Sequence, residues 1–189
     1  MPIIVTAGSG QKFTPAPSGV HQAVCVDVVD MGVMQVTWKG ETKKQHKIRL
    51  VWQIEELMDD ARPFIVQKRY TASVGDKANL RKDLESWRGR PFTDVELAGF
   101  DVESVIGANC LLNVMQVQKD GETYANVTAV MPIKKGMTKL TPRDYVRVQD
   151  RTETSANGHD DEPLTVEDIP FAWLMPFVLP ALGVMGWMA

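Results

Sequence analysis

Residues 43–92 read KKQHKIRLVWQIEELMDDARPFIVQKRYTASVGDKANLRKDLESWRGRPF, and this stretch decides the fold. It begins with a run in which every second residue is apolar, which is the pattern of a strand with one buried face. A second strand-like run at 64–72 mixes apolar, cationic and aromatic residues. The first run therefore predicts a sheet with one apolar and one cationic face. The apolar set is Ile48, Leu50, Trp52 and Ile54, and the opposite set is Lys47, Arg49, Val51 and Gln53.

After the second run the apolar period changes from two to that of a helix. Leu80, Leu84 and Trp87 recur at helical spacing, with basic residues between them. Gly89 follows the last periodic residue, and glycine commonly ends a helix. We therefore predict a helix over residues 76–88 that packs its apolar stripe on the sheet.

Outward from this stretch, the remaining strands are predicted at residues 20–29, 110–118 and 122–132. A run at 33–39 either continues the first strand or pairs back on it. Asp120-Gly121, flanked by alternating apolar residues, is the clearest hairpin signal. The order is three strands, a helix and a hairpin, which predicts a mainly β fold: a five-stranded OB-type Greek-key barrel with a helix between strands 3 and 4. A generic β-sandwich is the alternative.

Composition divides the chain into a body and a tail. We predict a flexible lead-in over residues 1–18, an OB-fold domain over 19–140, and a C-terminal tail with an acidic linker over 141–168 and an apolar segment over 169–189. The polar, acidic stretch 148–163 within the tail is predicted to be disordered. Residues 1–140 carry 18 basic and 16 acidic side chains, whereas residues 141–189 carry 3 and 8. A basic body with an acidic tail is typical of proteins that bind nucleic acid.

A cationic sheet face that also bears rings suits a flexible polyanion. Lysine and arginine contact phosphates, and aromatic rings stack on bases of any sequence. We therefore predict a binder of single-stranded nucleic acid. Trp52 and Trp87 are assigned to the core because they share a face with apolar residues. The predicted phosphate contacts are Lys43, Lys47, Arg49, Lys68, Lys77, Arg88 and Arg90, and the predicted stacking rings are Trp38, Tyr70 and Tyr124.

The same residues give little support for catalysis. The three histidines are scattered, and none has metal-ligand spacing with a cysteine or another histidine. No complete nucleotide-binding, metalloprotease or serine-hydrolase motif occurs. We expect neither an enzyme nor a metal or cofactor, with a two-metal nuclease built from dispersed carboxylates as the remaining catalytic alternative.

Four segments of the body resemble small phage proteins described as single-stranded DNA-binding proteins with an OB-fold. This resemblance spans roughly residues 19–135 and implies a role in phage DNA replication, recombination or repair, in the host cytoplasm. The segments are HQAVCVDVVDMG (21–32), KIRLVWQI (47–54), KANLRKDLESWRGRPF (77–92) and TYANVTAVMP (123–132).

The tail carries a second resemblance. The segment ending in EDIPF is similar to the acidic tip of bacterial single-stranded DNA-binding proteins, in which the phenylalanine ends the chain. The resemblance implies that replication or recombination proteins dock on Asp168, Ile169, Pro170 and Phe171. Here eighteen uncharged residues follow Phe171. They could be an anchor, a segment that packs on the domain or a partner, or an extension of little function; prolines and the lack of flanking Lys or Arg disfavour a membrane span.

Two function hypotheses follow. The first is a non-specific binder of single-stranded DNA. The second is an OB-fold interaction module whose groove is filled by its own tail or by a partner protein. The only cysteines, Cys25 and Cys110, lie in apolar runs, so a reducing compartment such as the cytoplasm is expected. A homo-oligomer is compatible with the sequence.

Overall fold

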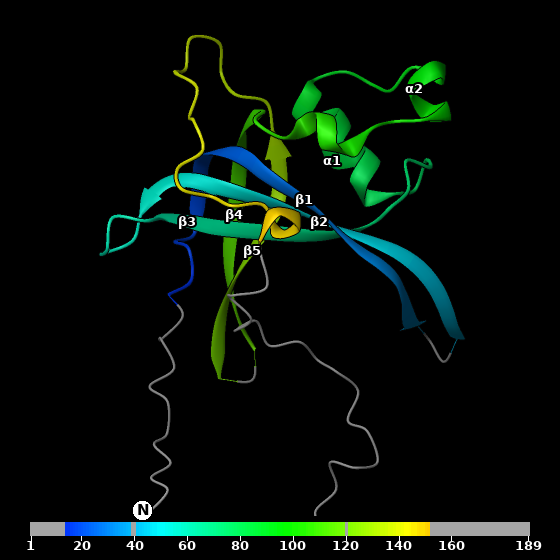
Figure 1. The fold of residues 1–189 in the computed structure, drawn as a ribbon, viewed down its shortest axis with the longest axis horizontal. Coiled ribbons are helices and arrows are strands. Elements are labelled where there is room, and N and C mark those ends of the chain that lie inside the picture. The colour runs from blue at the N-terminus through cyan, green and yellow to red at the C-terminus, as the bar shows by residue number, and fades with distance from the viewer. Residues whose placement is uncertain (1–13, 39–40, 120, 152–189) are drawn as a thin grey trace, which may run out of the picture. The chain divides into compact units, whose positions relative to one another are not determined.

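The computed structural model describes residues 14–38, 41–119 and 121–151. They form a mainly β fold around one antiparallel five-stranded sheet with the order β3-β2-β1-β4-β5 (Figure 1). The mainly β class and the order of three strands, a helix and a hairpin are confirmed. The strands are β1 (Gly19–Trp38), β2 (Glu41–Leu57), β3 (Pro63–Thr71), β4 (Asn109–Lys119) and β5 (Glu122–Met131), and the helices are α1 (Asn79–Arg88) and α2 (Asp94–Ala98), with 3₁₀ turns η1 (Val102–Val105) and η2 (Val148–Asp150).

β1 is one continuous strand, so the run after Gly32 continues the strand and does not pair back on it. The register with β2 shifts at two places, between Cys25 and Asp27 and between Asp30 and Val33. Beyond the second shift, residues 33–38 and 41–46 form a two-stranded ribbon that extends away from the rest of the sheet (Figure 1). The β4–β5 hairpin extends in another direction.

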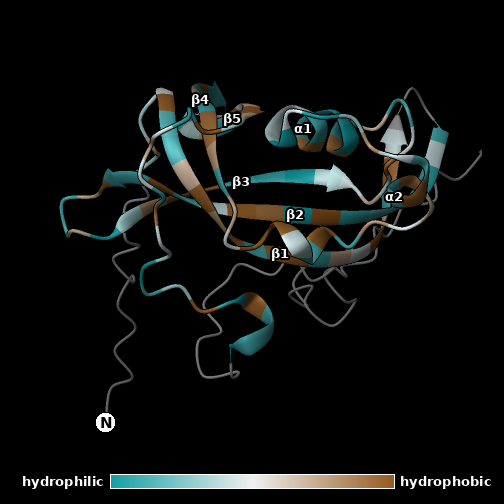
Figure 2. Ribbon diagram, turned by 90° about the horizontal axis from the view of Figure 1, so that it is seen from above, coloured by the Kyte–Doolittle hydropathy of each residue, from teal (hydrophilic) through white to brown (hydrophobic). Residues whose placement is uncertain are grey.

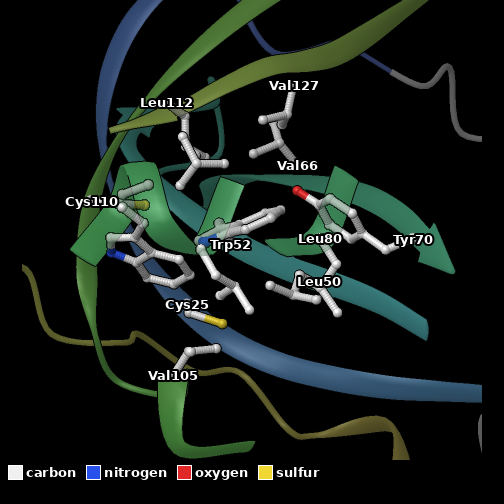
Figure 3. Close-up of a cluster of buried hydrophobic side chains, with 14 of the residues drawn as sticks. Cys25, Leu50, Trp52, Val66, Tyr70, Leu80, Val105, Cys110, Leu112 and Val127 are labelled. Carbon is white, nitrogen blue, oxygen red and sulfur yellow. The ribbon is translucent and has the colours of Figure 1, made fainter. Parts of the chain in front are cut away.

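The core lies on the face of the sheet that carries the apolar set of β2 (Figure 3). Trp52 is 0% exposed, and its ring centroid is 6.1 Å from that of Trp87. The indole nitrogen of Trp87 donates to the carbonyl of Asn109 at 2.8 Å, which satisfies its one polar group. The assignment of both tryptophans to the core is therefore confirmed.

Helix α1 begins three residues later than predicted and ends where expected, at Arg88. Gly89 adopts φ 67°, a left-handed conformation that favours glycine and stops the helix. Leu80, Leu84 and Trp87 are buried beneath the helix. α1 contacts both β3 and β5, and these two outermost strands also contact each other.

Residues 138–151, which we call the strap, pack on the opposite face of the sheet from α1 (Figure 2). Leu140 and Tyr145 cover a second apolar cluster of Val24, Val26 and Val51. The predicted acidic linker begins at residue 141, and the structure describes its first part, residues 141–151, as a segment that packs on the sheet. Despite its polar composition, a few apolar side chains and hydrogen bonds between its backbone and side chains of the sheet hold it there.

Other predictions about the ends of the chain lie outside the described residues. These are the lead-in over 1–13, the linker beyond residue 151 and the apolar segment 169–189. Within the described part of the chain, no helix has the length and apolar character needed to cross a membrane.

Candidate nucleic-acid interface

The outward faces of β2 and β3 carry three basic side chains, Lys47, Arg49 and Arg69, which we call the basic cluster. The core-facing residues alternate with them, so the buried face fixes the outward direction of these three. Arg49 and Arg69 are direct partners across the two strands, and Lys47 is opposite Thr71 in the next row. The cluster is therefore a product of strand register, since the two arginines are 20 residues apart in the sequence.

Like charges placed directly opposite each other on neighbouring strands repel. In the described ranges, no carboxylate forms an ion pair with any member of the basic cluster. Lys47 Nζ donates to Thr71 Oγ1 at 2.8 Å, which orients the ammonium group but leaves its charge uncompensated. An anion bound here would relieve the repulsion.

Arg49 is the most enclosed member of the cluster. Its Nε is buried, and among the residues that the structure describes none accepts a hydrogen bond from it. On β1 its direct partner is Val29, which offers no charge. A buried donor without a partner is costly, so this nitrogen marks a place where an added acceptor would be stabilising.

The strap closes one side of the basic cluster. Tyr145 packs on the apolar cluster that includes Val51 and Val29, and Val29 is the direct partner of Arg49. The guanidinium carbon of Arg151 lies 5.7 Å from the centre of the Tyr145 ring. Burial and the neighbouring Asp27 carboxylate raise the pKa of Tyr145 to about 12, so the phenol is neutral at physiological pH.

Asp27 is the acidic side chain next to this site, and the strap neutralises it. The buried carboxylate accepts hydrogen bonds from the backbone N–H of Val148 at 2.8 Å, from Arg147 Nε at 3.1 Å and from the Tyr145 hydroxyl at 3.2 Å. Arg147 also donates to Glu103 at 2.7 Å. The charge of Asp27 is thus compensated locally and does not oppose an anion on the basic cluster.

Tyr70, predicted to stack on a base, cannot do so. The side chain is 3% exposed, and its hydroxyl donates to Asp83 Oδ2 at 2.7 Å. Burial raises the pKa of Tyr70 well above its ordinary value. The same Asp83 oxygen accepts from Lys68 Nζ at 2.6 Å, so Lys68 is engaged in an ion pair against α1. Both residues lie on the core-facing side of β3. The burial of Tyr70 contradicts the prediction that its ring stacks on a base.

Arg88 and Arg90, two of the predicted phosphate contacts, form ion pairs with Glu96. Glu96 is the third residue of α2 and forms a capping box with the N-cap residue Thr93. These hydrogen bonds lower the pKa of Glu96 to about 2. Arg88 in addition lies over the rings of Phe92 and Phe100, with the guanidinium carbon 4.6 and 5.4 Å from their centres.

The remaining predicted residues are not members of the basic cluster. Lys43 is exposed on the ribbon and forms an ion pair with Glu41 at 2.8 Å. Trp38 pairs with Glu41 through the backbone at the distal end of the ribbon, and its side chain lies outside the described residues. Lys77 is exposed in the loop before α1. Tyr124 is 43% exposed on the β4–β5 hairpin, with its hydroxyl 2.7 Å from Glu122.

Of the ten predicted DNA-contacting residues, the structure therefore places two, Lys47 and Arg49, side by side on the sheet. Sequence reasoning missed Arg69 and Tyr145. The parity of β3 could have identified Arg69, because Val66 and Tyr70 face the core and the residue between Lys68 and Tyr70 must face outward. For Tyr145 the available signal was the spacing of Leu140, Tyr145 and Val148 within an otherwise polar segment.

Two further observations concern metal ligands and cavities in the described residues. No group of three or more His, Cys, Asp or Glu side chains within them is placed to hold a metal ion. A cavity of about 460 Å³ lies beside α1, remote from the basic cluster, and its lining includes Trp87, Phe100 and the Arg88–Glu96 pair. Its ionic groups are already bonded to one another.

Comparison with known proteins does not assign the chain to a family. No protein-family model matches it, and a search of the curated proteins found no significant match.

Proposed function

We propose that this chain binds single-stranded DNA without reading its sequence, and that the outward face of β2 and β3 is the binding surface. The observation that carries the proposal is the basic cluster: two directly opposed arginines and a lysine, without ion-pair partners among the described residues. Phosphates would supply the missing negative charge and an acceptor for Arg49 Nε. The protein acts as a binder and not as an enzyme, and it needs no cofactor.

The proposal includes an OB-type barrel. Supporting it are the strand order, the contact between β3 and β5, and the position of α1 between β3 and β4 in the chain. In OB-folds, the β2–β3 face and the loops beside it bind oligonucleotides. By its resemblance to phage single-stranded DNA-binding proteins, the chain would coat exposed strands during phage DNA replication, recombination and repair, in the host cytoplasm and with replication proteins as partners.

The test is a salt titration of binding to labelled oligo-dT, read by fluorescence anisotropy, with a duplex of equal length alongside. We expect tighter binding to the single strand and a steep loss of affinity as salt rises. Lys47→Gln combined with Arg69→Gln should lower the slope of log K against log salt by about 1.4, since each single-strand phosphate contact contributes about 0.7. Both changes conserve the strands and remove only charge.

The matched control is Lys82→Gln combined with Lys134→Gln. These two lysines are exposed outside the basic cluster, so the control changes the net charge equally. It should keep most of the slope. Equal affinity for duplex and single strand, or an equal loss of slope in both double variants, would reject the proposed surface.

A second function has one specific observation in its favour. The strap already covers the part of the outer face formed by Val24, Val26 and Val51, so this sheet accepts a polypeptide segment. An interaction module would extend that use to a partner protein. If the full-length protein fails to bind oligo-dT at low salt, this function is favoured over DNA binding.

A further inference from the structure

The strap brings one aromatic ring to the border of the basic cluster. Tyr145 packs against the apolar cluster of Val24, Val26 and Val51, and Val29 packs against the same cluster. Val51 lies two residues after Arg49 on β2, and Val29 is the direct partner of Arg49 on β1. Two of the rings predicted to stack, Tyr70 and Tyr124, do not share this place. Tyr70 is sealed in the core, and Tyr124 lies on the β4–β5 hairpin.

The ring is held firmly but not enclosed. Its hydroxyl donates to Asp27, and its apolar body rests on the valines of the sheet. Arg151, whose own side chain is exposed, lies over the ring. A cation–π contact at an exposed site is weaker than the stacking of a nucleobase on a ring, so a base can take the place of Arg151. Arg151 Nε also donates to the Val146 carbonyl at 3.2 Å, and the remaining donors of the displaced guanidinium can meet a phosphate.

We propose that Tyr145 is a base-stacking residue and that the strap, with Arg151, forms one wall of the single-strand site. This inference rests on the proposed function, because it places a base on a ring beside phosphates held by Lys47, Arg49 and Arg69. It assigns the aromatic half of the site to a segment outside the five strands. It also predicts that the hydroxyl of Tyr145 serves the fold, whereas the ring serves the ligand.

The experiment compares Tyr145→Leu and Tyr145→Phe with the wild-type full chain, using labelled oligo-dT and an abasic oligonucleotide of the same length. Tyr145→Phe keeps the ring and should bind oligo-dT within about 2-fold of the wild type. Tyr145→Leu keeps apolar packing but removes the ring, and it should weaken oligo-dT binding by about 5- to 100-fold. The salt slope should stay the same, since stacking releases no counterions.

The abasic strand separates a stacking role from a structural one. It presents phosphates without bases, so wild type and Tyr145→Leu should bind it equally. An equal loss of affinity for both strands in Tyr145→Leu would show that the ring only shapes the phosphate site, and would overturn the inference. Oligo-dT binding by Tyr145→Leu at the wild-type level would overturn it too, while leaving the proposed function intact.

A measurement on the wild type covers the case in which Tyr145→Leu does not fold. Ultraviolet crosslinking to oligo-dT, followed by mass spectrometry of the peptides, should give an adduct at Tyr145. Adducts confined to other residues would contradict the inference. Absence of any binding by the wild type would reject the proposed function itself, so the two failures are distinguishable.

Discussion

The side chain of Asp27 joins β1 to the strap. Its carboxylate is buried at a register shift in β1, and its three donors all come from the strap. Charged acceptors make stronger hydrogen bonds than neutral ones. These hydrogen bonds to Asp27 thus hold Tyr145, Arg147 and Val148 in fixed positions beside the basic cluster.

We expect Asp27→Ala to lower the free energy of unfolding by about 2–3 kcal/mol, because buried donors lose a charged acceptor. Arg147 is partly exposed and can regain water, which keeps the loss below that of a fully buried pair. Urea unfolding followed by tryptophan fluorescence measures the change. The control is Asp59→Ala in the exposed turn before β3, which should stay within about 0.5 kcal/mol of wild type.

Tyr145 should make stability depend on alkaline pH. Its pKa is raised to about 12 in the folded protein, chiefly by burial, whereas an unfolded tyrosine titrates near 10. The contribution of the neutral phenol is therefore complete below pH 10 and is lost as the pH rises through 12. The stability difference between wild type and Tyr145→Phe should shift against the wild type over this window; a difference independent of pH would contradict the assignment.

At the scale of the elements, α1 is the part whose end depends on a single residue. Gly89 ends it with a positive φ, and a side chain there would be strained even though the space around it is open. The stop places Arg90 and Phe92 in the turn that leads to α2. Changing this glycine thus tests backbone conformation without any change in packing.

Gly89→Ala should destabilise the protein by about 1–2 kcal/mol, the cost of a left-handed conformation for an L-residue. Gly99→Ala is a matched control, because Gly99 has φ −176° and equally open space. Extended backbone suits alanine, so Gly99→Ala should be neutral or slightly stabilising. Thermal unfolding by circular dichroism distinguishes the two, and equal effects would refute the conformational argument.

The element scale also explains what the sequence could predict. Alternation in residues 48–54 and the helical period of Leu80, Leu84 and Trp87 reflect burial on one face, which local pattern reports directly. The strand and helix positions follow from it. Pattern alone could not tell that the strap packs on the sheet, because that contact depends on hydrogen bonds to side chains distant in the sequence. Gln53 lies 90 residues before its partner Arg143, and Asn109 lies 31 residues before its partner Leu140.

The candidate site was harder to predict for a similar reason. A basic residue can contact a phosphate or form an ion pair within the protein, and the sequence does not show which until the partner is known. Lys68 forms an ion pair with Asp83, and Arg88 and Arg90 both form ion pairs with Glu96. Those pairings arise from tertiary packing of α1 and α2. Only the residues fixed by strand parity, Lys47 and Arg49, kept the outward position that the alternation predicted.

At the scale of the whole molecule, two side-chain amides of the sheet form reciprocal hydrogen-bond pairs with the strap backbone. Asn109 Oδ1 accepts from Leu140 N at 2.7 Å, and Asn109 Nδ2 donates to the Leu140 carbonyl at 2.9 Å. Gln53 forms the same reciprocal pair with the backbone of Arg143. Each amide thus bonds the strap backbone as a neighbouring strand would, and the two together attach the strap to β2 and to the start of β4.

Asn109→Ala should therefore loosen a large part of the strap at once. We expect a loss of about 1–3 kcal/mol in unfolding free energy, because the backbone groups of Leu140 lose their partners. Hydrogen exchange at Leu140, Arg143 and Val148 should become faster while exchange in β2 stays slow. Asn126→Ala, at an exposed position on β5, is the control. Unchanged exchange in the strap would contradict this account.

The strap has a consequence for how the protein is made. Val148 is synthesised 121 residues after Asp27, the carboxylate that it caps. A nascent chain that has left the ribosome only as far as β5 has the five strands that the structure describes but lacks the three donors of the Asp27 carboxylate. The described fold is thus completed only when residues 138–151 emerge, and we expect a chain that stops before Val148 to be more sensitive to proteases.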